Sequence, residues 1–297
     1  MDEFEASLRL PGASRCETIG PITRFAPSPT GYLHLGHAFA ALFAAAAAAR
    51  DHGRFLLRIE DIDRRRCRRE FETALLEDLR WLGLYWAEPV RRQSEVMETY
   101  RAALARLEAM DLVYPCFCSR KEILDEIAAI GAAPQGPDGV IYPGTCLRLA
   151  HPERRRRQAE GQPFALRLNM TRALAMVPPL TWYDRGQGVV IADPGMFGDI
   201  VLARKDTPAS YHLAVTVDDH IQGVTLVTRG NDLFRATHIH RLLQALLGLD
   251  TPDYHHHELI ADSDGRRLAK RDQAPTLRAL RAAGHNPKEI RIRLGFS

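Results

Sequence analysis

The sequence predicts an α/β fold in which a doubly wound parallel sheet is interrupted by an inserted subdomain and followed by a short helical tail. Three observations support this prediction. Short apolar strands alternate with longer helical segments near both ends of the chain, which is typical of parallel sheets with crossover helices. Residues 111–205 break this alternation with cysteines, glycines, prolines and an arginine run. The chain of 297 residues is also long enough to bury a sizeable core.

The first half of the sheet is expected within residues 22–110. Thr23–Ala26 is interpreted as a short strand that ends at Pro27, and Arg54–Ile59 as a buried strand. Apolar periodicity and end signals predict three helices in this half, namely Leu35–Arg50, Phe71–Leu82 and Tyr100–Met110. The resulting strand–helix–strand order indicates a parallel, doubly wound sheet.

The second half of the sheet is expected within residues 206–261, where the alternation returns. It comprises the segments Leu213–Val217 and Val224–Thr228 and the helix Ala236–Leu247. Residues 262–297 are expected to form a DSDG turn, a basic loop and a short helical end. The sequence contains no recognisable internal repeat. We expect this tail to be too short to fold as a separate domain.

Composition narrows the class of protein. The net charge of +3 is only weakly basic, so charge alone does not indicate nucleic acid. Residues 1–21 are an expected N-terminal extension without the apolar core of a signal peptide, and the longest apolar run, Ala38–Ala49, is too short to span a bilayer. The five cysteines favour a reducing compartment. We therefore expect a cytoplasmic monomer that does not bind membranes.

The most informative stretch is RFAPSPTGYLHLGH, residues Arg24 to His37. Its two prolines fix an extended loop after a strand, and Gly31 lets the backbone pass close to a ligand. A helix then begins near His34, and helix starts after parallel strands bind phosphate readily. His34 and His37 share one face there and can donate hydrogen bonds to phosphate oxygens. A metal-binding or purely structural histidine pair is the alternative, which the preceding loop disfavours.

This stretch resembles the signature of class I aminoacyl-tRNA synthetases of the glutamyl group, with HLGH at the place of the family's HIGH-type motif. Two further segments, LLRIEDID (Leu56–Asp63) and YHLAVTVDDHIQGVTLVTRGNDL (Tyr211–Leu233), resemble glutamyl-synthetase segments in the same order. The resemblance covers most of the chain from about residue 22. It implies a Rossmann-like catalytic domain that uses L-glutamate and ATP, with Mg²⁺ as part of the ATP complex.

The resemblance also implies roles for particular residues. The expected glutamate-binding residues are Arg24, Phe25, Ala26, Pro27, Ser28, Glu60, Tyr211 and Arg229. The carboxylate of Glu60 suits an α-ammonium group, and the two arginines suit carboxylates. Which arginine reads the side-chain carboxylate of glutamate stays open at this point.

The expected ATP-binding residues are His34, Gly36, His37 and Lys270, and the expected catalytic residues are His34, His37 and Lys270. Lys270 lies in RLAKR and matches the lysine that grips ATP phosphates in class I enzymes. Ala269 stands where a serine is common, which leaves the cation but removes one hydroxyl contact.

A zinc site is expected in the inserted subdomain. Cys116 and Cys118 form a C-x-C pair, and Tyr142 and Cys146 follow with Y-x-x-x-C spacing. Three thiolates and one oxygen suit tetrahedral zinc, and no ligand position is left open for water. We therefore expect one structural Zn²⁺ per chain. The other cysteines are interpreted as ordinary thiols.

The short tail after Lys270 and the C-x-C…Y-x-x-x-C pattern together resemble the glutamyl-Q tRNA(Asp) synthetases, which lack an anticodon-binding domain. Those enzymes activate glutamate and attach it to the queuosine base of tRNA(Asp). A minimal glutamyl-tRNA synthetase that charges the tRNA 3′ end is one alternative. A non-catalytic paralogue that binds RNA or a nucleotide is another, disfavoured by the intact HLGH, Glu60, Arg229 and Lys270.

Two basic runs, Arg64–Arg69 and Arg154–Arg157, allow two interpretations. They can neutralise phosphates of an RNA backbone, a contact that carries no base specificity. They can equally be solvated helix faces.

Overall fold

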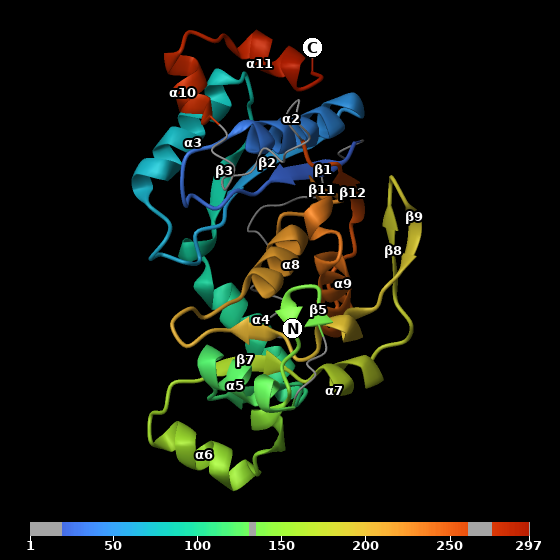
Figure 1. Ribbon diagram of the computed structural model, residues 1–297. Helices are drawn as coiled ribbons and strands as arrows, with labels where there is room; N and C mark the ends of the chain where they lie inside the picture. The colour runs from blue at the N-terminus through green and yellow to red at the C-terminus, as the bar shows by residue number, and fades with distance from the viewer. Residues whose placement is uncertain (1–19, 131–134, 261–274, 297) are drawn as a thin grey trace.

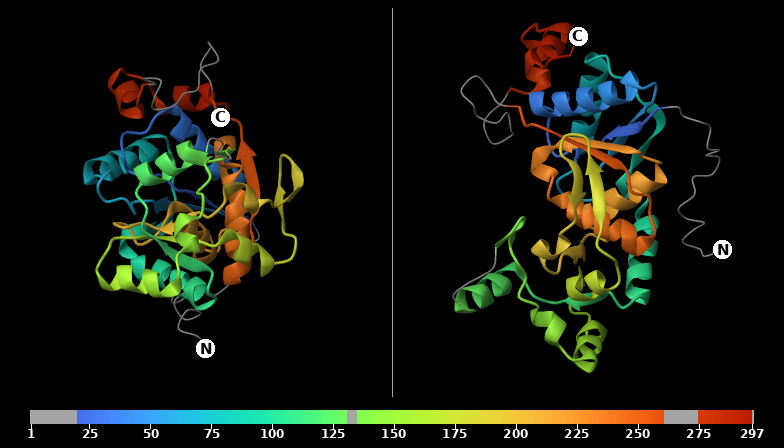
Figure 2. Two further views of the ribbon diagram at one scale, coloured as in Figure 1. Left: turned by 60° about the horizontal axis from the view of Figure 1, so that its bottom comes forward. Right: turned by 90° about the vertical axis from the view of Figure 1, so that its right-hand side faces the viewer.

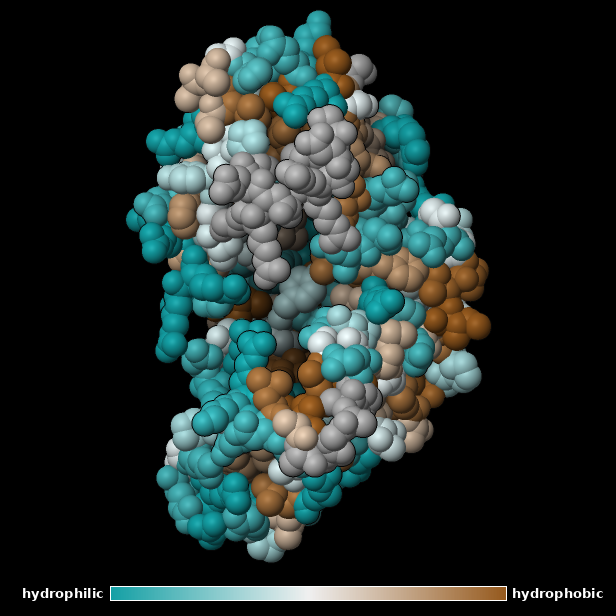
Figure 3. Space-filling view, viewed as in Figure 1, coloured by the Kyte–Doolittle hydropathy of each residue, from teal (hydrophilic) through white to brown (hydrophobic). Residues whose placement is uncertain are grey.

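The computed structural model describes residues 20–130, 135–260 and 275–296. The molecule has two parts: parallel strands between helices form one, and most of residues 111–205 form the other (Figure 1). The predicted α/β fold with a parallel sheet is confirmed. The surface is hollowed between the two parts (Figure 3).

Two sheets lie edge to edge in the first part, with strand orders β1-β2-β3 and β11-β12-β8-β9. The strand bounds are β1 (Ile22–Phe25), β2 (Arg54–Ile59), β3 (Ala87–Arg92), β8 (Thr181–Asp184), β9 (Gly188–Ile191), β11 (Leu226–Gly230) and β12 (Asp253–His257). The backbone N–H of Thr225 donates to the carbonyl of Ile22 (3.0 Å), and Arg24 Nη1 donates to the carbonyl of Thr228 (3.1 Å). Strands β1 and β11 therefore run in the same direction, so their carboxyl ends meet at one edge.

Helices cover both faces of these strands, as a doubly wound arrangement requires (Figure 2). On one face lie α2 (Leu35–Arg50), α3 (Arg69–Trp81), α10 (Leu277–Ala282) and α11 (Pro287–Arg293). On the other lie α4 (Met97–Ala109), α8 (Tyr211–Ile221) and α9 (Ala236–Leu247). Helices α2 and α9 and strand β2 have the bounds that the sequence predicts. Helices α3 and α4 begin two or three residues earlier than expected.

The local sequence explains where helix α2 begins and ends. Alanine has the highest helix propensity, which favours a helix along this alanine-rich segment. Its N-cap is His34, and it ends at Asp51 and His52 before Gly53. A Cβ atom at Gly53 would lie 2.0 Å from the carbonyl oxygen of Pro21. Only glycine therefore lets the chain turn from α2 into β2 beside β1.

The segment Leu213–Val217 does not continue the strand pattern but lies within helix α8. The helix begins at Ser210, whose hydroxyl accepts a hydrogen bond from the N–H of Leu213 (3.4 Å). Most of the α8 residues are buried between the sheet and helices α4 and α9. A helix buried all round has a continuous apolar run, which periodicity alone cannot distinguish from a buried strand.

The other part of the molecule is built around a three-stranded antiparallel sheet with the order β10-β7-β4. Its elements are β4 (Val113–Cys116), α5 (Arg120–Ile130), β5 (Gln135–Gly136), β6 (Gly139–Val140), α6 (His151–Ala159), β7 (Ala165–Leu168), α7 (Met170–Ala175) and β10 (Val201–Ala203). Four 3₁₀ helices complete the described chain: η1 (Gln93–Glu95), η2 (Thr145–Arg148), η3 (Pro194–Phe197) and η4 (Asn231–Leu233). The hairpin β8–β9 pairs with β12 and so belongs to the first part.

Some predictions fall outside the described residues. These are the DSDG turn, the RLAKR loop with Lys270, and nearly all of the N-terminal extension. Within the described ranges, no helix is both long and apolar enough to cross a membrane.

Candidate active site

A small cavity of about 110 Å³ opens where the loops after β1 and β2 meet the start of α8. Ser28, Glu60 and Tyr211, three of the residues that the sequence singled out, line this cavity, which we call the Glu60 cavity. The backbone N–H of Glu60 donates to the carbonyl of Pro27 (3.0 Å), which ties the two loops together. The carboxyl ends of neighbouring parallel strands therefore form the site, as is usual in open α/β sheets.

Behind this cavity lies a largely buried network of charged groups. Arg58 Nη1 donates to Asp219 Oδ1 (2.7 Å), and Arg58 Nη2 donates to Glu60 Oε1 (3.3 Å). Arg24 Nε donates to the same Asp219 oxygen at 2.9 Å. Asp218 lies 3.8 Å from Arg58 Nε and accepts a hydrogen bond from Arg91 Nε (2.7 Å). Each arginine of this network thus has at least one carboxylate partner.

Burial and charge act in opposite directions on these groups. Burial raises the pKa of Glu60, and the nearby cations Arg58 and Arg24 only partly offset this effect. Burial also opposes ionisation of Asp219, but Arg24 and Arg58 outweigh it and hold the pKa of Asp219 below its usual value. The network therefore favours an ionised Asp219, whereas Glu60 gains from a further cation beside its carboxylate.

Arg229 has a different environment, although it is equally buried at 5% exposure. Its Nε donates to His256 Nε2 (3.1 Å), and its Nη1 lies 3.2 Å from His240 Nδ1 and 3.4 Å from the hydroxyl of Tyr211. Its Nη2 donates to the hydroxyl of Thr237. Across the described ranges, no carboxylate lies within ion-pairing distance of Arg229.

Both histidines that face Arg229 are neutral. Burial, reinforced by the charge of Arg229, lowers the pKa of His256 to about 4 even though Asp184 Oδ2 lies 2.7 Å from its Nδ1. Burial and Arg229 also hold the pKa of His240 well below its ordinary value. Neutral imidazoles can accept hydrogen bonds from the guanidinium but cannot neutralise it. The charge of Arg229 therefore suits an anionic ligand group beside Tyr211.

The HLGH motif forms the start of helix α2. Nδ1 of His34 accepts a hydrogen bond from the backbone N–H of Gly36 (3.1 Å), and Nδ1 of His37 accepts one from the backbone N–H of His34 (3.3 Å). In a neutral ring, such a bond to Nδ1 places the proton on Nε2, which can donate to a phosphate oxygen. Thr276 forms a β-bridge with His34, so the described chain resumes beside this motif after residue 274.

The other predicted site residues lie at varying distances from the cavity. Arg24 and Arg229 lie behind its wall, and Tyr211 connects Arg229 to the cavity. Phe25 is packed in the apolar cluster beneath α2, and Ala26 is half-buried next to it. Pro27 contributes its carbonyl to Glu60. The position of Lys270 is outside the described residues.

Sequence reasoning missed most of the residues that hold these arginines. The missed residues are Arg58, Asp218, Asp219, Asp184, Thr237, His240 and His256. A usable signal was present for three of them, because Arg58 interrupts the apolar strand RFLLRI and the two aspartates interrupt the buried helix sequence LAVTVDDHI. A charged residue inside a buried element requires a partner, and these are partners of one another.

The predicted zinc ligands come together in the other part of the molecule. The three sulfur atoms of Cys116, Cys118 and Cys146 all lie within 4.8 Å of one another. The Tyr142 hydroxyl lies 3.4 Å from the Cys116 sulfur and 3.6 Å from the Cys118 sulfur. Ligand atoms about 2.3 Å from a central zinc would have mutual distances of this size in a tetrahedral site. The four donors therefore fit a zinc ion.

Comparison with known proteins gives a consistent result. Residues 22–295 match the family described as tRNA synthetases class I (E and Q), catalytic domain. The chain is 50% identical over 285 residues to a glutamyl-Q tRNA(Asp) synthetase of Rhodobacter capsulatus, covering 93% of this chain and 100% of the relative. It is 45% identical over 277 residues to a protein of the same name from Symbiobacterium thermophilum, covering 90% of this chain and 83% of the relative. The crystal structure of a glutamate-tRNA synthetase from Elizabethkingia anophelis superimposes with a TM-score of 0.78 at 27% identity, covering 93% of this chain and 61% of that one.

Proposed function

The chain belongs to the class I tRNA synthetases of the E and Q group, and we infer that it is a ligase that activates glutamate with ATP and transfers it to queuosine in tRNA(Asp). Relatives with that name align over most of the chain, at identities up to 50%. The choice of amino acid rests on the buried charge of Arg229, whose partners among the described residues are all neutral. Such a site suits a substrate with a second carboxylate.

We assign the side-chain carboxylate of glutamate to Arg229 and Tyr211, and the α-ammonium group to Glu60. Arg24 is already neutralised by Asp219, so its role is to shape the pocket and hold that acid in place. Ser28 lines the same cavity and can donate its hydroxyl to the substrate. Glutamine would leave Arg229 without an anion in a desolvated site, a mismatch that such sites reject strongly.

In the first step, an α-carboxylate oxygen of glutamate attacks the α-phosphorus of ATP. A new P–O bond forms, the bond to the β-phosphate oxygen breaks, and pyrophosphate leaves. The start of α2 with His34 and His37 is proposed to donate hydrogen bonds to the phosphates, with Lys270 and Mg²⁺ adding positive charge. No covalent bond to the protein is needed, because positioning and charge stabilisation supply the catalysis.

In the second step, a nucleophilic group of the queuosine base attacks the carbonyl carbon of glutamyl-adenylate. The mixed-anhydride bond breaks, AMP leaves with the bonding electrons, and the nucleophile loses its proton. A labelled-glutamate assay tests this proposal on tRNA(Asp) with queuosine, on the same tRNA without it, and on tRNA(Glu). We expect transfer only to the queuosine-containing RNA, and pyrophosphate exchange without any tRNA. Charging of tRNA(Glu) at its 3′ end would instead favour a minimal glutamyl-tRNA synthetase.

We also propose that Cys116, Cys118, Cys146 and Tyr142 hold one structural zinc ion. When bound, the ion would cross-link β4, η2 and the turn between them and would take no part in the chemistry. Metal analysis should find about one zinc per chain, and Cys116→Ser with Cys118→Ser should remove it. Unchanged zinc content in that double variant would contradict the assignment. For the whole protein we propose a cytoplasmic monomer, which gel filtration of the purified chain tests in part.

A further inference from the structure

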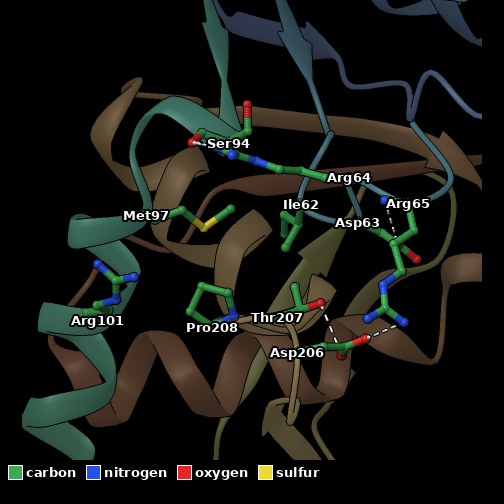
Figure 4. Close-up of a pocket in the computed structure, with 10 residues that line it drawn as sticks. All are labelled: Ile62, Asp63, Arg64, Arg65, Ser94, Met97, Arg101, Asp206, Thr207 and Pro208. Carbon is green, nitrogen blue, oxygen red and sulfur yellow. Dashed lines mark hydrogen bonds and ion pairs between the residues drawn. The ribbon is translucent and has the colours of Figure 1, made fainter. Parts of the chain in front are cut away.

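A second cavity adjoins the Glu60 cavity, and we propose that it receives the modified nucleobase that accepts glutamate. It has a volume of about 450 Å³ and lies between the loop after β2, the start of α4 and residues 206–208 (Figure 4). We call it the Met97 cavity, after a side chain that lines it and does not line the Glu60 cavity. The inference rests on the proposed function, because it concerns where the RNA acceptor of that reaction lies.

Position is the first reason for this assignment. Ile62, Asp63 and Thr207 line both the Met97 cavity and the Glu60 cavity, so the two spaces share a wall. The acceptor group must reach the carbonyl carbon of glutamate bound beside Glu60. A base held in the Met97 cavity can extend its hydroxyl-bearing ring past that shared wall toward the carbonyl.

The lining of the Met97 cavity suits a nucleobase. Ile62 and Met97 point toward each other across it, and Pro208 lies below them (Figure 4). The rim carries polar groups, including the Arg65–Asp206 ion pair at 3.5 Å and Arg64, whose Nη2 donates to the carbonyl of Ser94 (3.0 Å). An unstacked RNA base needs an apolar face to pack on and hydrogen-bonding groups at its edges, and both are present here. The volume lies within the roughly 300–1,000 Å³ that small-molecule sites occupy.

Positively charged side chains near the Met97 cavity suit the RNA phosphates on either side of the bound base. The neighbouring cavity of about 390 Å³ shares Arg101 and Pro208 with it and adds Arg204 and Lys205. Lys205 Nζ donates to the carbonyl of Phe117 (3.2 Å), and in the described ranges no carboxylate lies within ion-pairing distance of it. Of the cations around the two cavities, Arg65 pairs with Asp206 and Arg101 pairs with Glu98, whereas Arg64, Arg204 and Lys205 have no ion-pair partner among the described residues. Such a group of cations can bind the phosphates of an RNA backbone.

A further cavity, of about 660 Å³, also has Tyr211 in its lining. Its charged lining resembles that of the Met97 cavity, because Asp138 and Asp199 line it together with three arginines. One of these arginines, Arg167, lies 3.9 Å over the ring of Tyr142, so this cavity borders the proposed zinc site. We therefore assign the base to the Met97 cavity rather than to this one.

Filling the Met97 cavity tests the assignment. Met97→Trp places a large apolar ring in the space without changing charge, and Met97→Leu is the matched control. Pyrophosphate exchange with glutamate and transfer to a queuosine-containing anticodon stem-loop are measured for both. We expect Met97→Trp to lower kcat/KM for transfer by at least about tenfold, because the ring occupies space that the base needs and so misplaces the acceptor, while exchange stays within about twofold of wild type. Met97→Leu should resemble wild type in both assays.

Removing one cation tests the path of the RNA backbone separately. Arg101→Ala should weaken binding of stem-loops with and without queuosine alike, and should reduce the slope of log K against log salt by about 1. Arg50→Ala is the control, because Arg50 at the end of α2 is about as exposed as Arg101 and lines none of the four cavities described above. It should leave the slope unchanged.

The outcomes separate this inference from the proposed function. Wild-type protein that exchanges pyrophosphate but transfers glutamate to no queuosine-containing RNA would contradict the proposed function. Wild-type transfer that persists in Met97→Trp would overturn the base assignment alone. Equal loss of exchange and transfer in Met97→Trp would also overturn it, since the cavity would then serve activation. If Met97→Trp does not fold, Arg101→Ala decides: a salt slope equal to that of Arg50→Ala overturns the proposal.

Discussion

A pair of buried arginines, Arg24 and Arg58, lies beside a third, Arg229, and the partners of the pair differ in kind from those of Arg229. Arg24 and Arg58 share the carboxylate of Asp219, at 2.9 and 2.7 Å. Arg229 is bonded to histidines, a threonine and a tyrosine, all of them neutral. The groups are comparably buried, since Arg24 is 4% exposed and Arg229 is 5% exposed. Burial alone therefore does not separate a structural arginine from one that binds a ligand.

The difference separates stability from function. A buried cation is costly unless a charge of opposite sign accompanies it. Asp218, Asp219 and Glu60 provide that charge for the Arg24–Arg58 group, which joins β1 and β2 to helix α8. Nothing comparable is present for Arg229 in the described part of the chain. The buried charge of Arg229 therefore lacks an anionic partner there, and we propose that the side-chain carboxylate of glutamate provides one.

The largest expected effect is on the structural group. Arg58→Met would leave two aspartates and Glu60 buried without their shared cation, which typically costs about 3–5 kcal/mol. Urea unfolding should show this loss of stability. The control is Arg50→Met, because Arg50 forms an exposed ion pair with Asp51 and its side chain is 68% exposed. This change should alter the free energy of unfolding by no more than about 1 kcal/mol. Equal stabilities of the two variants would show that the buried carboxylates do not depend on Arg58.

A pH titration probes the neutral partners of Arg229. Burial holds the pKa of folded His256 at about 4, below its ordinary value of 6.5, so the unfolded state binds the proton more readily. The contribution of His256 to the free energy of unfolding is therefore fully present above about pH 6.5. It is lost as the pH drops toward 4, and the loss from this residue is about 3 kcal/mol at most. His256→Asn should lose that part of the pH dependence. If the wild-type and variant curves stay parallel between pH 7 and 4, His256 is not held neutral.

Thr237→Asp would turn the second group into a copy of the first. It places a carboxylate where Arg229 Nη2 now meets a hydroxyl, so the guanidinium gains an internal anion. We expect kcat/KM for glutamate in pyrophosphate exchange to fall on the order of a hundredfold, because a buried charge pair is typically worth 2–5 kcal/mol. Thr237→Asn keeps the size without the charge and should retain most of the activity. Similar activity of the two variants would show that the charge of Arg229 does not matter.

Tyr211→Phe should have the smallest effect. The hydroxyl lies 3.4 Å from Arg229 Nη1, a long hydrogen bond, and it reaches into the Glu60 cavity. Loss of one neutral hydrogen bond is worth about 1 kcal/mol, so KM for glutamate should rise about fivefold with kcat nearly unchanged. A loss as large as that in Thr237→Asp would mean that Tyr211, and not Arg229, carries the recognition.

Sequence reasoning located the elements around the site better than the contacts within it. Helix α2 and strand β2 have the predicted bounds because local signals flank them, such as the loop before His34 and the His52–Gly53 turn. The cysteine spacing likewise predicted a cluster that the structure contains. Segment Leu213–Val217 misled, because a helix buried all round has no apolar stripe.

The partners of the arginines could not be predicted in the same way. Arg58 and Asp219 are 161 positions apart in the chain, and only the fold brings them together. The three histidines of β12, at positions 255–257, alternate in direction, and only His256 bonds to Arg229. The choice between Arg24 and Arg229, open from the sequence, therefore depended on tertiary contacts.

The most direct test of the central claim is pyrophosphate exchange by Arg229→Gln with glutamate and with glutamine, alongside Arg24→Gln. We expect Arg229→Gln to lose at least about a hundredfold in kcat/KM for glutamate, and its preference for glutamate over glutamine to collapse. Its stability should not fall, because no carboxylate loses its partner, whereas Arg24→Gln should be less stable. An Arg229→Gln protein that still prefers glutamate as strongly as wild type would contradict the claim that Arg229 reads the side-chain carboxylate.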